Sequence, residues 1–539
     1  MMKKTIHKLL ALTLAFLMVA ALTACGGGGG DAPSPAPSGD GQPAASGTPA
    51  GGEGGYADQI VICRNADCIA LEPQAEGISP TESTVMTQIW ENLVKPDSEG
   101  NIVGALAESW EISDDGLTYT FQLKPGVKFN NGTDVTVEDW AFSLIRARDS
   151  LTSSYAARLA DLDTVTGEGN TLVLTLKRPA ADFLANLCMF NAVVGSKAHW
   201  EAVGEEEYVS GPPVATGPYM LKEWVREQYL ILEANPYYHE EGLPKTKEIK
   251  YVVAAEDSTR VMQIQAGEVD ILTDVPFTFQ DTIESTSGVQ ANIYPNTQVR
   301  YFILNTTQAP FDDINVRKAL YSGINKTELA QIVIGENGAP AAGIVSDAQG
   351  KWYNDSLPLD SFDPEACKQA LTDAGYTLPI KFTLSCRAGN EIYEQTAVML
   401  KSQLDQAGFE VEIERLEGAA LSDKFQSLSH QATLLQWTDD VFDPSGVVGW
   451  AVEWIQSRCY YTGLQDQALE DLFHEANVEL DPDKRVEMYH EIQRQIYENA
   501  NIIPLFRNSI MYATQSNITG LEVDPFSNYE CMYLQKSLG

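Results

Sequence analysis

The segment LLQWTDDVFDP, residues 434–444, places three aspartates close behind a tryptophan. A carboxylate that is withdrawn from water binds a cation such as an ammonium group strongly, because a desolvated charge needs a partner of opposite sign. The same aspartates, Asp439, Asp440 and Asp443, can instead cap a turn in front of Pro444. The segment is therefore a candidate cation-binding site, with turn capping as the alternative.

The sequence lacks the common motifs of hydrolytic enzymes. It holds no G-x-S-x-G nucleophile elbow and no H-E-x-x-H zinc motif, since His474-Glu475 and His490-Glu491 each lack the second histidine. Scattered carboxylates could still meet in space as the acid pair of a glycosidase. We expect no enzymatic activity, no cofactor and no metal site.

Cysteines are spread along the chain rather than clustered. Beyond Cys25 they are Cys63, Cys68, Cys188, Cys367, Cys386, Cys459 and Cys531. Only Cys63 and Cys68 are close enough in sequence for a loop to bridge them, and a zinc site would need more such pairs. We expect most of these thiols to be buried and unreactive.

The N-terminus has the order of an export signal. Three lysines precede the apolar run LLALTLAFLMVAAL of residues 9–22, which is short for a bilayer span. The following Leu22-Thr23-Ala24-Cys25 resembles the lipobox of bacterial lipoproteins, in which the cysteine is lipidated. We predict a signal peptide over residues 1–24, a lipid anchor at Cys25 and a place at the outer face of the bacterial cytoplasmic membrane. A plain signal peptide with an incidental cysteine is the alternative.

Composition separates a linker from a folded body. The segment 25–55 consists of the cysteine and a stretch, residues 26–55, that is almost entirely Gly, Ala, Pro, Ser and Asp, which predicts a disordered linker. The whole chain has 36 basic and 75 acidic residues and a net charge of −39, so it should repel nucleic acid and anionic lipid. Its apolar content of 44% is ample for packed cores.

Helical and strand patterns alternate through the body, which favours a mixed α/β fold. Apolar residues at every second position predict strands at 117–123 and 171–176, and residues 136–148 between them have the pattern of a capped amphipathic helix. In the segments 258–272 and 394–416, a glycine ends a helix and a strand follows.

Several of these stretches, in this order, resemble the family 5 extracellular solute-binding proteins, the peptide- and nickel-type binding subunits of ABC importers. The stretches are GALAESWEISDDGLTYTFQLKPGVKFNNGTDVTVEDWAFSL (104–144), TGPYMLKEW (216–224), LEANPYYHEEG (232–242), RVMQIQAGEVDI (260–271), LNTTQAPFDDINVRKALYSGINKTEL (304–329) and QLDQAGFEVEI (403–413). Together they are distributed over nearly all of the mature chain.

The resemblance implies an α/β fold with two lobes, the periplasmic-binding-protein-like fold of class II enlarged by an extra domain, with mixed sheets and flanking helices. The predicted domains are domain I (56–79, 213–299 and 509–539), domain II (80–212) and domain III (300–508), of which the first two form one lobe. The chain should cross between the lobes at 299–306 and 502–509, where extended apolar sequences predict a hinge of paired strands.

By the same resemblance the protein captures a small peptide in the cleft between the lobes and delivers it, as a monomer, to the permease subunits of an ABC transporter. In peptide-binding members a Trp-x-x-Asp motif presents its aspartate to the α-amino group of the ligand. Trp437 and Asp440 match this motif, and we add Thr438 and Trp450 as further ligand contacts. Both tryptophans can instead fill the core.

The loop after the first strand is expected to form the other wall of the cleft, with Arg64 and Asn65 as its polar ligand contacts. Solvent exposure at the end of a strand is the alternative for both residues.

One departure from the family concerns the ligand. Members that select very short peptides can carry an arginine for the ligand carboxylate near the helix that precedes residues 407–413. Here that region has Glu391 and Glu394, with only Arg387 upstream. Longer peptides, cationic peptides and non-peptide solutes such as an oligosaccharide, nickel or a metal chelate therefore stay open, as do a secreted hydrolase and a receptor without a transport role.

Overall fold

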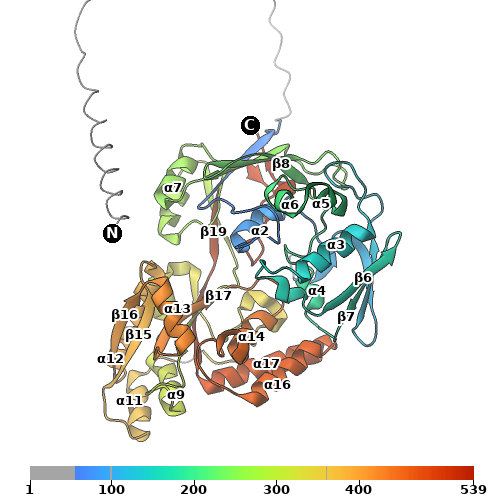
Figure 1. Cartoon of the computed structure of the whole chain (residues 1–539). Coiled ribbons are helices and arrows are strands. Elements are labelled where there is room, and N and C mark those ends of the chain that lie inside the picture. Colours follow the sequence, from blue (N-terminus) through green and yellow to red (C-terminus); the bar gives the residue numbers. More distant parts are fainter. Residues whose placement is uncertain (1–54, 98–99, 360, 539) are drawn as a thin grey trace, which may run out of the picture. The chain divides into compact units, whose positions relative to one another are not determined.

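A computed structural model describes residues 55–97, 100–359 and 361–538 (Figure 1). The predicted signal peptide, Cys25 and nearly all of the predicted linker lie outside the described residues. No helix among the described residues is long and apolar enough to cross a membrane.

Sheet I has seven strands in the order β12-β19-β11-β1-β10-β9-β8. Its strands are β1 (Gln59–Arg64), β8 (Tyr219–Val225), β9 (Tyr229–Ala234), β10 (Glu248–Val253), β11 (Ile271–Leu272), β12 (Val289–Tyr294) and β19 (Ile510–Gln515). The central strand β1 runs parallel to both of its neighbours, β10 and β11. Ile60 and Ile62 of β1 are completely buried, so this strand anchors the core of the sheet.

Sheet II has four antiparallel strands in the order β4-β5-β7-β6. Its strands are β4 (Ala107–Ile112), β5 (Thr118–Leu123), β6 (Leu162–Glu168) and β7 (Thr171–Leu176), so the two strands predicted from alternation are confirmed. The predicted helix is α3 (Val137–Arg148), which packs against β6. Its cap is reciprocal, because Thr136 and Asp139 each accept a hydrogen bond from the backbone of the other.

Sheet III has six strands in the order β14-β18-β13-β17-β15-β16. Its strands are β13 (Val299–Leu304), β14 (Gly338–Pro340), β15 (Ile380–Arg387), β16 (Phe409–Leu416), β17 (Ala432–Trp437) and β18 (Ile502–Asn508). All residues of β13 are buried, as expected for a central strand. Helix α12 (Glu391–Gln406) crosses from β15 to the parallel strand β16, and Gly408 makes the turn with a φ of 97°.

The chain passes between sheet I and sheet III twice. Strand β12 of sheet I is followed by β13 of sheet III, and β18 of sheet III is followed by β19 of sheet I. Because β12 pairs with β19 and β13 pairs with β18, the two connections, residues 295–298 and Ser509, lie side by side. The extended crossing segments predicted from sequence are thus β13 and β18 themselves, with the connections at their ends. The division into domains I to III stays a prediction.

The remaining elements surround these sheets. The helices are α2 (Pro80–Met86), α4 (Phe183–Asn186), α5 (Lys197–Val203), α6 (Glu205–Ser210), α7 (Asp257–Gln265), α8 (Gln280–Glu284), α9 (Ile314–Gly323), α10 (Lys326–Val333), α11 (Pro364–Asp373), α13 (Gly418–Ser427), α14 (Ser445–Val452), α15 (Trp454–Ser457), α16 (Gln467–Val478) and α17 (Pro482–Asn499). Short 3-10 helices are η1 (Ala156–Leu159), η2 (Phe277–Phe279), η3 (Gly335–Asn337), η4 (Asp347–Trp352) and η5 (Cys531–Tyr533). Small strands are β2 (Val94–Pro96), β3 (Ile102–Gly104), β20 (Ile518–Thr519) and β21 (Gln535–Lys536).

Candidate functional site

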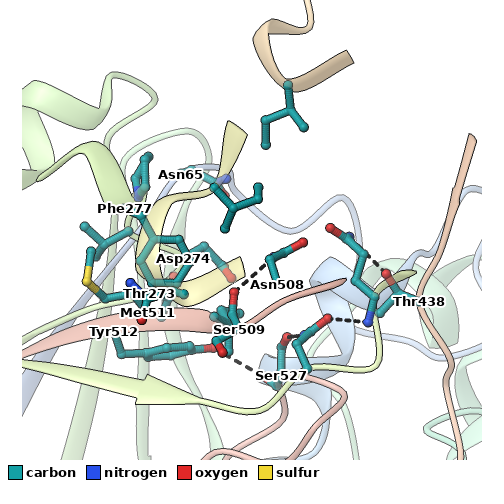
Figure 2. Close-up of a pocket in the computed structure, with 18 of the residues that line it drawn as sticks. Asn65, Thr273, Asp274, Phe277, Thr438, Asn508, Ser509, Met511, Tyr512 and Ser527 are labelled. Carbon is teal, nitrogen blue, oxygen red and sulfur yellow. Dashed lines mark hydrogen bonds between the residues drawn. The ribbon is translucent and has the colours of Figure 1, made fainter. Parts of the chain in front are cut away.

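A cavity of about 2130 Å³ lies where sheet I and sheet III meet. Sheet I contributes residues that follow β1 and β11, such as Asn65 and Asp274, and sheet III contributes Thr438 after β17 (Figure 2). The connections between the sheets also line the cavity, with Asn296 and Ser509. Pockets for drug-sized molecules measure about 300–1,000 Å³, so this cavity has room for a larger ligand.

Four of the six predicted ligand contacts line this cavity, namely Asp440, Thr438, Arg64 and Asn65. Trp437 and Trp450 are not among its lining residues in the part of the chain that the structure describes. Their ring centroids are 5.4 Å apart, and both rings pack against the buried cluster that includes residues of β13. Their assignment as ligand contacts stays a prediction that this lining does not support.

Asp440 is partly shielded from solvent, and its carboxylate has a protein partner. The side chain is 20% exposed, and Asp440 Oδ2 accepts a hydrogen bond from Arg158 Nη2 at 3.4 Å. Arg158 belongs to η1, between helix α3 and strand β6. Burial raises the pKa of Asp440, and the Arg158 guanidinium opposes this effect without cancelling it. The carboxylate can thus accept a ligand cation but shares its charge with Arg158.

Asp439 is buried beside Asp440 and serves a different purpose. Asp439 Oδ1 accepts a hydrogen bond of 2.8 Å from Trp437 Nε1, and its backbone N–H donates to Thr297 Oγ1 at 3.0 Å. Burial raises the pKa of Asp439 to about 7. Asp439 therefore ties the end of β17 to the connection that leads into β13, and Trp437 is held by this bond.

Asp443 holds the start of α14 and forms a buried ion pair. Its Oδ1 accepts a hydrogen bond from the Ser445 backbone N–H at 3.0 Å, and Arg485 of α17 binds both carboxylate oxygens at 2.5 and 3.0 Å. Burial acts to raise the pKa of Asp443, but Arg485 outweighs it and holds that pKa below its usual value. The capping alternative for this loop therefore describes Asp443, with a buried charge pair added.

Arg64 and Asn65 end β1 on the other wall of the cavity. Asn65 is exposed, whereas Arg64 is buried, and its Nη1 donates to Cys68 Sγ at 3.0 Å. The seven cysteines that the structure describes are all free, so no disulfide joins Cys63 to Cys68. Arg64 also lies over the Tyr251 ring, 5.8 Å from its centroid, so its guanidinium is fixed on two sides.

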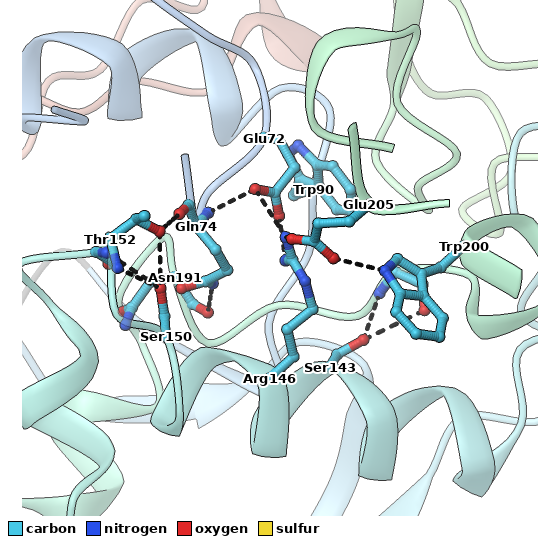
Figure 3. Close-up of polar contacts among 12 residues, drawn as sticks. Glu72, Gln74, Trp90, Ser143, Arg146, Ser150, Thr152, Asn191, Trp200 and Glu205 are labelled. Carbon is cyan, nitrogen blue, oxygen red and sulfur yellow. Dashed lines mark hydrogen bonds and ion pairs between the residues drawn. The ribbon is translucent and has the colours of Figure 1, made fainter. Parts of the chain in front are cut away.

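A polar network fixes the loop that follows Arg64 and Asn65 (Figure 3). Arg146 of α3 bridges two carboxylates, with Glu72 Oε1 and Glu205 Oε1 each 2.7 Å from its guanidinium. Burial raises the pKa of Glu72, although Arg146 opposes this effect. Trp200 Nε1 donates to the other oxygen of Glu205 at 2.6 Å. The loop between β1 and α2 is thus attached to α3 and α6 rather than loose.

Acidic residues lie on both walls of the cavity, including Glu336 and Glu391 on the side of sheet III. The part that follows β11 and includes α8 carries acidic residues: Asp274, Asp281 and Glu284. Arg387, at the end of β15 in sheet III, is exposed and also lines the cavity. Among the described residues no group of three or more His, Cys, Asp or Glu side chains could hold a metal ion.

Two arginines of this region were not found from the sequence. Arg158 lies 282 residues from Asp440 in the sequence, and no local pattern predicts their contact. Arg485 did leave a signal, because its spacing to Tyr489, Ile492 and Ile496 places it on the inner face of α17. A charged residue on an apolar helix face predicts a buried partner.

Comparison with known proteins identifies the family. Residues 101–454 match the bacterial extracellular solute-binding proteins, family 5 (middle). The chain belongs to this family. It is therefore an extracellular solute-binding protein of the type that serves ABC importers, and the mixed α/β periplasmic-binding-protein fold expected from the sequence is confirmed.

Individual relatives and solved structures are distant in sequence but match along nearly their whole length. The glutathione-binding protein GsiB of Escherichia coli (strain K12) is 25% identical over 485 residues, which are 88% of this chain and 93% of GsiB. The structure of DppA from Helicobacter pylori in complex with the peptide STSA has 22% identity and a TM-score of 0.72, covering 88% of this chain and 98% of DppA. AppA from Bacillus subtilis in complex with a nonapeptide has 22% identity and a TM-score of 0.72, covering 90% of this chain and all of AppA.

Proposed function

We propose that the protein is the lipid-anchored binding subunit of an ABC importer and that it captures peptides in the cavity between sheets I and III. The observation that carries this proposal is the cavity itself, which is large and presents the shielded carboxylate of Asp440 at its wall. A peptide with a free N-terminus supplies the cation that such a carboxylate accepts. The names of GsiB, DppA and AppA, which report glutathione or peptide ligands, support the same class of solute.

Capture and release follow from the two connections between the sheets. Residues 295–298 and Ser509 lie side by side, so sheet III can rotate relative to sheet I by changes in a few backbone angles. A peptide that contacts both walls stabilises the closed arrangement by as much as it prefers that arrangement over the open one. The closed, loaded protein is then the form that the permease subunits recognise.

The anchor at Cys25 and the linker of residues 26–55 place this cycle at the outer face of the cytoplasmic membrane. Two or more acyl chains are needed for stable attachment, at roughly 0.8 kcal/mol per buried CH₂ group. A monomer is sufficient for the proposed cycle, because both walls of the cavity come from one chain.

Titration calorimetry on the purified body, residues 56–539, tests the peptide assignment. The probes are Ser-Thr-Ser-Ala, glutathione, maltotriose and a nickel–histidine chelate. We expect heat of binding from at least one of the two peptides and none from maltotriose or the chelate. Binding of the sugar or the chelate without binding of either peptide would replace the peptide by a non-peptide solute.

A further inference from the structure

Arg300 is a buried cation on the central strand of sheet III. It is 6% exposed, and the residues that share its face of β13, Phe302 and Leu304, belong to the hydrophobic core. Among the described residues no carboxylate forms an ion pair with it, and its Nε atom has no hydrogen-bond partner. A charge in such a position is costly unless something offsets it.

Within the part of the chain that the structure describes, the side chain of Arg300 makes one hydrogen bond, and it leads to the cavity. Arg300 Nη1 donates to Gln436 Oε1 at 2.5 Å, across the β13–β17 pair in which these two residues are directly opposite. A guanidinium has only donors, so the Gln436 oxygen must face Arg300 and the amide nitrogen must face away. Gln436 is exposed and lines the cavity, and no acceptor for its Nε2 is found among the described residues.

A second arginine lies close to the Arg300 site. Its guanidinium carbon lies 5.9 Å from the centroid of the Tyr393 ring on α12, and Arg387 is the second cation near this tyrosine. Of the acidic residues of α12, Glu394 pairs with Arg415 at 3.1 Å, whereas Glu391 lines the cavity and accepts a hydrogen bond from Gln395 at 2.8 Å.

We propose that Gln436, oriented by the buried Arg300, binds a carboxylate of the ligand on the sheet III wall of the cavity. Arg300 is a positioning residue here: it turns the amide N–H₂ group toward the cavity and supplies the positive potential that a carboxylate offsets. The proposal rests on the proposed function in that the ligand is a peptide, and it deepens that function by naming the chemical group that this wall recognises.

Gln436→Glu is the sharpest variant. It keeps the shape of the side chain, gives Arg300 an ionic partner and removes the N–H₂ donor from the cavity. The variant should unfold at the same or a higher urea concentration than the wild type, so a loss of binding cannot be a loss of folding. Gln290→Glu adds the same charge on the exposed face of β12, outside the cavity lining, and serves as the control.

The readout is the preference for an acid over its amide. Ser-Thr-Ser-Ala has a single carboxylate, and we expect the wild type and Gln290→Glu to bind it at least about tenfold more tightly than Ser-Thr-Ser-Ala-amide. Gln436→Glu should abolish this preference, and Arg300→Met should reduce it while Arg300→Lys, which retains a charge and a donor, keeps part of it. Equal affinity of the wild type for acid and amide, or a full preference in Gln436→Glu, would overturn the proposal.

A separate measurement covers the case in which Ser-Thr-Ser-Ala does not bind. Succinate and succinamide are then compared by thermal unfolding of the wild type and of Gln436→Glu. Stabilisation of the wild type alone, by succinate alone, supports the carboxylate site even if the peptide assignment fails. Absence of that difference overturns the site, whereas peptide binding without an acid preference overturns the site and leaves the proposed function standing.

Discussion

Arg158 and Asp440 form an ion pair at the cavity wall, with 3.4 Å between Arg158 Nη2 and Asp440 Oδ2. Neither side chain is fully buried, since they are 22% and 20% exposed. A ligand ammonium that reaches Asp440 therefore meets a carboxylate whose charge is already shared with a guanidinium. The affinity for that ammonium should depend on both residues, in opposite directions.

Asp440→Asn keeps the shape of the side chain and removes its charge. For a peptide with a free N-terminus we expect a loss of about 2–5 kcal/mol, by analogy with other shielded charge pairs. This corresponds to at least a roughly thirtyfold loss of affinity.

Arg158→Gln should have the opposite effect and tighten binding of the peptide, because it leaves the Asp440 carboxylate without its partner within the protein. It also removes the influence that lowers the pKa of Asp440, so binding should fail at a higher pH than in the wild type as the solution is acidified.

Calorimetry with a free and an N-acetylated version of Ser-Thr-Ser-Ala measures both effects. Acetylation should weaken binding to the wild type and have little effect on Asp440→Asn. If acetylation of the peptide does not weaken its binding to the wild type, Asp440 does not bind an α-amino group, and an uncharged solute such as an oligosaccharide becomes the better assignment.

Asp439 predicts a pH dependence of stability. An unfolded aspartate has a pKa of about 3.9, whereas burial raises the pKa of Asp439 to about 7. Between these values the folded protein holds a proton that the unfolded chain has released, so this residue makes the protein less stable as the pH rises from 4 to 7. Asp439→Asn removes the titration and keeps an acceptor oxygen for Trp437 Nε1.

The difference in unfolding free energy between Asp439→Asn and the wild type should therefore shift in favour of the variant by roughly 2–4 kcal/mol as the pH rises from 4 to 7. Urea denaturation at pH 4.5, 6 and 7.5 measures the gain, with the exposed Asp373→Asn as control. A constant difference between variant and wild type at the three pH values would show that Asp439 is ionised throughout.

Asp443 contributes more to stability than a turn cap, because it belongs to a buried ion pair. Turn capping alone would make Asp443→Asn cost about 1 kcal/mol or less. In the structure Asp443 and Arg485 form a buried bidentate pair, with side chains 3% and 5% exposed. Asp443→Asn and Arg485→Met should each cost about 3–5 kcal/mol, because each leaves the other charge buried without a partner.

Urea denaturation of the two single variants and of the double variant checks this. The double variant should lose less than the sum of the singles, because the two side chains act as one unit. Lys368→Met, which removes an exposed pair with Glu365, is the matched control and should cost about 1 kcal/mol or less. If each single variant loses as little unfolding free energy as this control, the Asp443–Arg485 pair is not desolvated.

Local sequence patterns are sufficient to predict individual helices and strands, but not the contacts between them. The strands at 118–123 and 171–176 and the capping box of Thr136 with Asp139 follow from alternation and from a spacing of three residues. Such signals depend only on neighbouring residues, so one sequence contains them completely.

The roles of the site residues, in contrast, cannot be predicted from local sequence patterns. The three aspartates of residues 439–443 look alike in sequence, yet Asp439 binds a tryptophan, Asp440 a distant arginine of η1 and Asp443 an arginine of α17. These roles depend on which residues the fold brings opposite each carboxylate. For the same reason the sequence leaves two roles open for Trp437, which packs against the core while its contact with the ligand stays a prediction.

The lipid anchor can be tested apart from the fold. Cys25→Ala removes the only atom to which the predicted lipobox could attach a lipid, so the variant should stay unprocessed or be released, without fatty-acid label. Its folded body should melt as in the wild type, because sheets I to III are built from strands within residues 59–515. Metabolic labelling with an alkyne fatty acid, followed by membrane fractionation, measures the attachment.

Cys188→Ala is the control for this labelling. Cys188 is a partly buried thiol of the body, and its Sγ donates only to the Leu184 carbonyl at 3.7 Å among the described residues. Its loss should leave the label and the membrane fraction unchanged. If Cys25→Ala and the wild type carry equal label, the lipid is attached at another residue. If neither carries label, the protein has no lipid anchor, and the export signal is an ordinary one that releases the protein from the membrane.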